Sequence, residues 1–169
     1  GRAGTTMRVV GVRGRGRAVL GPAVALGGGR RTAAVVVANG SRVESASRDA
    51  PAGETTAAKL TAVGPGECFA RPADLGSEAG CVALAEALAE REAKLHVLVN
   101  NSGTSWGAPM ETHSEKGWDK TYALNVKGVF FLTREVLPML DKASTDTDPG
   151  RVLNNSSIAG LRPKVFPTL

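Results

Sequence analysis

The chain has 169 residues, of which 42% are hydrophobic and 22% are charged, as expected for one globular domain. No apolar run reaches the roughly 20 residues of a membrane-spanning helix, and no charged segment followed by an apolar one marks a secretory leader. These features predict a cytoplasmic protein without a membrane partner. The formal net charge of +5 is unevenly spread, because no acidic residue precedes Glu44.

Nucleic acids and metal ions are two partners that the composition disfavours. Residues 13–17, Arg-Gly-Arg-Gly-Arg, could neutralise RNA phosphates, but no aromatic residue lies among them to stack on bases. Cys68 and Cys81 are thirteen positions apart, and His96 and His113 are isolated, so no metal-ligand spacing is present. We therefore expect no nucleic-acid partner, no metal site and two reduced thiols.

The first half of the chain predicts strands and helices of uneven quality. Residues 7–12 form a short apolar run that predicts a strand, and a Gly- and Arg-rich segment follows it. The helix expected over residues 17–26 is disrupted by Gly21 and Pro22, which cost about 1 and 3 kcal/mol in a helix interior. The β-branched run at residues 32–38 predicts a second strand, and residues 41–62 have weak helical character.

The second half gives stronger signals. Residues 67–75 predict a strand, residues 77–95 predict a helix with Ser77 as its N-cap, and residues 96–101 predict a buried strand. The longest helix is expected over residues 114–140, with a broad apolar face and a capping box formed by Thr112 and Glu115. A polar loop and a final strand at residues 151–157 follow.

Strands that alternate with helices, each strand a nearly continuous apolar run, predict an α/β fold. The expected architecture is a doubly wound, Rossmann-like parallel sheet that is incomplete at the C-terminus. Ligands of such sheets bind beyond the carboxyl ends of the strands. The segments expected at those ends are rich in Gly, Asn, Ser and Asp, as a cofactor cleft requires.

Three segments, LHVLVNNSG, ALNVKGVFFLT and GRVLNNSSIAG, occur in this order between residues 95 and 160. Together they resemble the Asn-Asn-Ala-Gly strand end, the Asn-containing helix and the serine-bearing strand of the short-chain dehydrogenase/reductase family. Ser102 stands where that family usually has Ala. The resemblance spans residues 67–169, is nearest the 3-oxoacyl-acyl-carrier-protein reductases, and implies an oxidoreductase that transfers hydride between a nicotinamide cofactor and a carbonyl or alcohol.

The resemblance implies catalytic roles for two side chains. Ser157 would hydrogen-bond the substrate carbonyl oxygen as negative charge develops on it, with Ser156 as its structural neighbour. Asn125 would hold a water in a proton relay, and a polar Asn among apolar helix residues is costly unless it is hydrogen-bonded. The alternative for Asn125 is an amide satisfied by a neighbouring backbone carbonyl.

The resemblance also implies a cofactor site along the strand ends. Asn100, Asn101 and Gly103 would line the ribose, since Gly103 permits a close approach of the backbone. Asp74 would accept a hydrogen bond from the adenine amino group, and Leu75 would lie beside it. The alternative for Asp74 is an ordinary helix-entry residue.

The family's phosphate loop, T-G-x-x-x-G-x-G, corresponds by this resemblance to residues 9–16. Gly14 and Gly16 fit the pattern, whereas Val10 stands where the first Gly belongs and Gly11 replaces it only in part. A helix N-terminus beside such a loop can receive a pyrophosphate through its free amide groups.

The choice of cofactor follows from charge. An NAD enzyme of this kind holds the ribose hydroxyls with an acid at the end of the second strand. The strand expected here ends without an acid, while Arg13 and Arg42 lie nearby and suit a 2′-phosphate. We therefore predict NADP rather than NAD.

The proton donor of the family is a Tyr that follows the serine by about a dozen residues, with a Lys four residues further on. The single tyrosine of this chain, Tyr122, precedes Ser157 and has Val126 four residues later, so it is not this motif. We therefore expect residues 1–169 to be one NAD(P)-binding Rossmann domain, the N-terminal part of a longer reductase domain, inactive by itself.

The substrate implied is a small carbonyl compound, with an acyl-carrier-protein-linked 3-oxoacyl group as the candidate, and the family suggests a homo-oligomer. The alternative is a non-catalytic nucleotide-binding or oligomer-partner protein derived from the same family.

Overall fold

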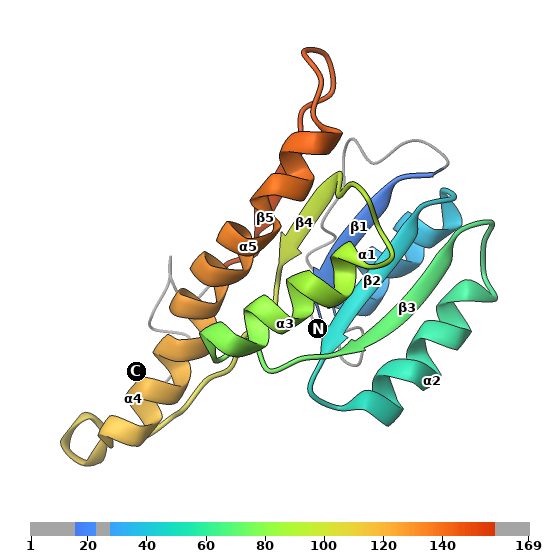
Figure 1. Ribbon diagram of the computed structural model, residues 1–169. Coiled ribbons are helices and arrows are strands. Elements are labelled where there is room, and N and C mark those ends of the chain that lie inside the picture. The colour runs from blue at the N-terminus through green and yellow to red at the C-terminus, as the bar shows by residue number, and fades with distance from the viewer. Residues whose placement is uncertain (1–15, 23–27, 158–169) are drawn as a thin grey trace.

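A five-stranded parallel sheet forms the centre of the molecule (Figure 1). The computed structural model describes residues 16–22 and 28–157. Its strands lie in the order β3-β2-β1-β4-β5. Their bounds are β1 Ala18–Pro22, β2 Arg42–Ser47, β3 Glu67–Pro72, β4 Val97–Asn100 and β5 Arg151–Asn154.

The helices cover both faces of this sheet, and the prediction of a doubly wound, Rossmann-like fold is confirmed. Helices α1 and α2 contact each other on one face, whereas α3 and α5 contact each other on the other face. The helical segments are α1 Gly28–Ala38, α2 Ala50–Thr61, α3 Glu78–Ala89, η1 Met110–Thr112, α4 Glu115–Tyr122, the π turn η2 Ala123–Lys127 and α5 Gly128–Ala143.

Side chains alternate along the strands between two apolar cores. Val19 and Val43 enter the core beneath α1 and α2, whereas Leu20 and Ala46 enter the core beneath α3 and α5. All strand pairs are parallel, so every carboxyl end lies at one edge of the sheet. The strand order reverses between β1 and β4, which is the place where ligands of such sheets bind.

Of the first three predicted elements, one cannot be compared with the structure and two differ from it. The strand predicted at residues 7–12 lies outside the described residues, and the first described strand, β1, occupies the segment predicted as a disrupted helix. Pairing with β2 and β4 on both sides buries Val19 and Leu20, so tertiary pairing overrides the helical signal.

The run predicted as a strand at residues 32–38 is part of helix α1. Its valines have high β-propensity, but Ala33, Val36 and Val37 are buried at helical spacing while Val35 is exposed. The polar segment at residues 41–62 divides into β2 and α2. Charged Glu44 interrupts the apolar signal of β2, which is why that strand could not be recognised.

The later elements agree with the predictions more closely. Ser77 caps α3 as predicted, because its hydroxyl accepts a hydrogen bond from Gly80 N at 3.1 Å. The predicted capping box is wrong, because Thr112 lies in η1 and the cap of α4 is Ser114, which accepts from Gly117 N at 3.2 Å. The long helix is interrupted by the π turn η2, where Asn125 lies.

A network of buried charges lies on β2 and β3. The carboxylate of Glu44 is fully buried and accepts a hydrogen bond from Arg71 Nε at 2.6 Å. Nearby, Arg42 Nη2 lies 3.1 Å from Glu92 Oε1. Burial raises the pKa of Glu92, the charge of Arg42 opposes this shift, and the charge of Glu44 adds to it. These pairs hold the side of the sheet farthest from β5.

Cys68 and Cys81 are free thiols inside the two cores. Burial raises the pKa of Cys68 to about 11, and the nearby Glu44 carboxylate adds to the shift. A thiol of this kind stays protonated and unreactive at neutral pH. Among the described residues, none of the helices combines the length and apolar character needed to cross a membrane.

Candidate functional site

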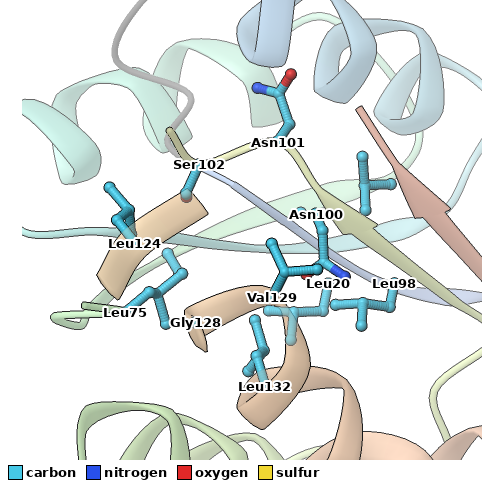
Figure 2. A pocket seen from close by; sticks show the side chains of 13 residues that line it. Leu20, Leu75, Leu98, Asn100, Asn101, Ser102, Leu124, Gly128, Val129 and Leu132 are labelled. Carbon is cyan, nitrogen blue, oxygen red and sulfur yellow. The ribbon is translucent and has the colours of Figure 1, made fainter. Parts of the chain in front are cut away.

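A pocket opens at the carboxyl edge, between the ends of the central strands and the start of α5 (Figure 2). Three residues predicted to bind cofactor, Leu75, Asn100 and Asn101, line it together. They come from the turn after β3 and from the end of β4, so the fold brings separate segments to one place. The remaining lining residues are Leu20, Gly21, Ala46, Leu98, Val99, Ser102, Leu124, Gly128, Val129 and Leu132.

Asn100 braces the sheet at the base of this pocket. Its side chain is buried, and Nδ2 donates to Thr133 Oγ1 at 3.1 Å and to Asn154 Oδ1 at 2.9 Å. The amide therefore ties β4 to both α5 and β5. The adjacent Asn101 accepts a short hydrogen bond from Asn155 Nδ2, so the end of β4 is fixed by two successive amide side chains.

Asn125 is held by the backbone of the loop that follows β4. Its Oδ1 accepts from Thr104 N at 2.9 Å and its Nδ2 donates to Thr104 O at 2.8 Å. The side chain is exposed, which corrects the expectation of a polar group buried among apolar neighbours. An alanine Cβ at Gly103 would lie 3.4 Å from Asn125 Oδ1, so the loop passes close to this amide.

Ser156 and Ser157 follow β5 at the same edge and are exposed. Their approach is fixed by Asn155 N, which donates to Asn100 O at 2.8 Å. Asn125 and Ser157 thus belong to segments that follow neighbouring strands β4 and β5. Among the described residues, neither of the two lines the pocket of Figure 2.

Asp74 lies just beyond β3 in a turn. Its Oδ1 accepts from Gly76 N at 3.1 Å and its carbonyl accepts from Ser77 N at 3.4 Å, so it prepares the entry to α3. Its side chain is exposed at the carboxyl edge. Leu75 is buried in the core, and its carbonyl packs so closely on α5 that a Cβ at Gly128 would lie 2.1 Å away.

The phosphate loop predicted at residues 9–16 does not fit the observed strand order. Gly11, Arg13 and Gly14 lie outside the described residues. Gly16 is described, and its N donates to Gly40 O at 3.3 Å at the amino end of β1, opposite the pocket. Its φ of +85° suits glycine for this turn. A phosphate loop must follow the first strand, so a phosphate role for Gly16 is ruled out by its position.

Arg42 is also misplaced by the sequence prediction. It begins β2 at the amino edge, where it faces Glu67 at 3.8 Å and Glu92 at 3.1 Å, so it cannot reach a nucleotide at the opposite edge. The error has one cause: the strand predicted to end before Arg42 is helix α1, and the true second strand begins at Arg42.

The charged residues at the carboxyl end of β2 are instead Arg48 and Asp49. Asp49 is the N-cap of α2, because its Oδ1 accepts from Ala52 N at 3.0 Å. Arg48 is exposed, and no residue in the described parts of the chain pairs with its guanidinium. The sequence held a signal for this helix start, an Asp followed closely by Pro51, and recognising it would have placed Arg48 correctly.

The strand order and the polar loops at the carboxyl ends define a doubly wound α/β domain with a candidate nucleotide cleft. Comparison with known proteins specifies the family. A model described as short chain dehydrogenase matches residues 19–167. The chain belongs to the short chain dehydrogenase family.

Several relatives are similar over most of the chain. The rhamnolipids biosynthesis 3-oxoacyl-[acyl-carrier-protein] reductase of Pseudomonas aeruginosa is 44% identical over 146 residues, 86% of this chain and 56% of the relative. A complex of Pseudomonas aeruginosa RhlG with NADP has a TM-score of 0.83 and 43% identity, covering 88% of this chain and 57% of the other. A metagenomic short-chain oxidoreductase in complex with NADP has a TM-score of 0.80 and 29% identity, covering 88% and 66%.

The chain therefore spans little more than half the length of the reductase that it matches.

Proposed function

We propose that residues 1–169 form the NADP(H)-binding, N-terminal part of a carbonyl reductase domain. The observation that carries the proposal is the pair of residues after β2. Asp49 caps α2 through Oδ1, and Arg48 is exposed at the same strand end, where none of the described residues pairs with its guanidinium. The arrangement suits a 2′-phosphate, because a guanidinium binds oxyanions through two parallel hydrogen bonds.

Other residues fit the rest of a dinucleotide. Gly28 and Gly29 open α1 after the first strand, where a helix N-terminus can receive a pyrophosphate. Asp74, Leu75, Asn100, Asn101 and Gly103 are the proposed contacts of the adenosine half and its neighbouring sugar, at the carboxyl edge. Two solved structures of the family were determined with NADP, which favours this nucleotide over NAD.

Ser157 and Asn125 are the proposed catalytic residues within this chain. NADPH, when bound, supplies the hydride. The hydroxyl of Ser157 would donate to the substrate carbonyl oxygen and stabilise its developing charge. Both polar atoms of the Asn125 side chain are hydrogen-bonded to the Thr104 backbone. In the proposed proton relay, the water would therefore be held by the main chain of Asn125, within the π turn.

The proposed substrate is a 3-oxoacyl group on acyl carrier protein. The support is the name of the Pseudomonas aeruginosa reductase, which is 44% identical to this chain. Within these 169 residues no Tyr-x-x-x-Lys follows Ser157. A positioned general acid contributes about 10²- to 10⁴-fold to a rate, so the 169-residue chain should bind nucleotide without measurable turnover.

The test combines a binding titration and an assay on the purified 169-residue chain. We expect intrinsic fluorescence to report NADPH binding that is tighter than NADH binding, and no NADPH oxidation with a 3-oxoacyl thioester. Tighter binding of NADH would contradict the choice of nucleotide. Rapid turnover would contradict the proposal that these 169 residues lack the general acid of the reaction.

A second function, as a partner in an oligomer, is favoured by a row of exposed apolar side chains. Trp118, Tyr122, Val126 and Phe130 recur every four residues along α4, η2 and α5, and each side chain is at least 47% exposed. We call this row the α4–α5 stripe. A second copy packed antiparallel and centred on Val126 would set Tyr122 against Phe130 of the other copy, burying aromatic surface on both sides.

A further inference from the structure

We propose that the hydroxyl of Ser102 is a nucleotide-binding group, which forms a hydrogen bond with a ribose hydroxyl of the bound dinucleotide. The inference rests on the proposed function, since it assigns a contact within the same cleft. Ser102 is half-buried at the pocket rim, and Figure 2 draws it between Asn101 and Leu124.

Few polar groups line the pocket. Most lining side chains are apolar, among them Leu20, Leu75 and Leu124. The Asn100 amide nitrogen is committed to Thr133 and Asn154, as described above. Of the described residues that line the pocket, Ser102 is the one that carries a hydroxyl, and no described residue hydrogen-bonds to it.

The backbone on both sides of Ser102 is held in place before any ligand binds. Asn101 is bonded to Asn155 through its side chain, and Thr104 is held at both N and O by Asn125. A group that is held in place before binding loses little conformational entropy when the ligand arrives. The hydrogen bond of Ser102 should therefore contribute to the binding free energy with little entropic cost.

The chemistry of the group selects the part of the ligand. A serine hydroxyl both donates and accepts, so it suits a partner that does the same. The sugar hydroxyls of a dinucleotide have this property, whereas its phosphates only accept. Leu124, which is half-buried next to Ser102, would contact the apolar face of the sugar or base, and the hydroxyl would fix its orientation.

The test is a Ser102→Ala substitution in the full 169-residue chain, with NADPH binding measured by calorimetry. One neutral hydrogen bond corresponds to a loss of about 3- to 10-fold in affinity. The matched control is Ser41→Ala, because the Ser41 hydroxyl is buried at the amino edge of the sheet and has no hydrogen-bond partner among residues 16–22 and 28–157. It removes the same atom far from the pocket and should leave the dissociation constant unchanged.

Two nucleotide halves show which sugar is bound. Adenosine 2′,5′-bisphosphate and nicotinamide mononucleotide, which carry one ribose each, are titrated into the wild type and the Ser102→Ala variant, and one of them should reproduce the loss. Equal affinity of wild type and Ser102→Ala for NADPH and for both halves would overturn this inference while leaving the proposed function standing. Absence of NADPH binding by the wild type would overturn both. Thermal unfolding of each variant confirms that the comparison is made between folded proteins.

Discussion

At the carboxyl end of β2, two neighbouring charged residues have different duties. Oδ1 of the Asp49 carboxylate accepts a hydrogen bond from the backbone of α2, while Arg48 is exposed and no described residue pairs with its guanidinium. The helix start therefore uses part of the hydrogen-bonding capacity of the acid, whereas none of the described residues uses the donors of the base.

Arg48→Ala should weaken NADPH binding by about 10-fold or more, since a hydrogen bond to a charged group contributes about 1.5 to 3 kcal/mol. Binding of NADH, which lacks the 2′-phosphate, should change little. Calorimetric titration of both nucleotides measures the difference.

Arg42→Ala is the control for this prediction, because it removes the same charge from the amino edge. Its NADPH affinity should stay within about twofold of wild type if the folded protein is retained, as expected for a charge beyond the screening length. A larger loss of NADPH affinity for Arg42→Ala than for Arg48→Ala would support the sequence-based prediction that Arg42 binds the 2′-phosphate.

Arg71 neutralises a carboxylate that has no access to water. Replacing it by Ala would leave Glu44 buried and unpaired, and we expect a loss of about 3 kcal/mol in the free energy of unfolding. Urea denaturation measures the loss. Arg134→Ala serves as the control, because its pairs with Glu78 and Glu135 are exposed and should contribute far less. Equal losses for both variants would show that the buried pair has no special role.

At the scale of elements, regular apolar periodicity made α3, β4 and the long helix predictable from sequence. The first half was predicted wrongly for a physical reason. Valines of α1 pack at helical spacing although their intrinsic preference is for strands, and β2 carries the buried charge of Glu44, which interrupts the apolar run typical of a buried strand. The prediction of a strand at residues 32–38 placed Arg42 at the wrong edge, and a first strand predicted before residue 18 led to the phosphate role given to Gly16, which precedes β1.

The site was predicted best where a motif fixed the residues independently of the element boundaries. Asn100 and Asn101 line the pocket, and their place in the fold could be predicted because the Asn-Asn pair follows a clearly recognisable buried strand; their contact with a ribose stays a prediction. For Asn125 the structure shows the alternative given by the sequence, an amide that donates to a backbone carbonyl, but Thr104 as its partner could not be foreseen, because it depends on the π turn and on how closely the loop after β4 approaches it. The position of Arg48 at the carboxyl end of β2 was not predicted, because the bounds of β2 were not recognised from the sequence.

Gly128 fixes the distance between the start of α5 and the turn after β3. Its Cβ in a Gly128→Ala variant would lie 2.1 Å from the Leu75 carbonyl oxygen, so the helix must shift, and we expect a loss of about 2 kcal/mol or more. Gly53→Ala in α2 is the control, since its Cβ would meet Ala70 at an ordinary 3.4 Å. There the better helix propensity should stabilise the fold by about 0.5 kcal/mol. Thermal denaturation distinguishes the two outcomes, and a harmless Gly128→Ala would refute the close packing.

At the scale of the whole molecule, the α4–α5 stripe exposes four large apolar side chains on one helical surface. The sequence predicted a broad apolar face for this helix, and the structure buries only part of it, through residues such as Leu132 and Val136. Contiguous exposed apolar surface of this kind marks sites of protein association.

Val126→Glu should therefore reduce the molar mass of the protein in solution, because it would bury two like charges at the centre of a symmetric contact. Light scattering after size-exclusion chromatography measures the mass. Val63→Glu provides a matched control on another exposed valine, 60% accessible and outside the stripe. A monomeric wild type, or equal behaviour of the two variants, would argue against the proposed contact.

The hydrogen bonds between Asn125 and Thr104 have a consequence for this association. Val126, at the middle of the stripe, is the next residue after Asn125, whose side chain holds the loop that continues from the pocket. A second copy that packs on Val126 would immobilise the π turn. The immobilised π turn would then reduce the motion of that loop. A higher protein concentration would then favour the oligomer and, through the same contacts, increase the affinity for the ligand.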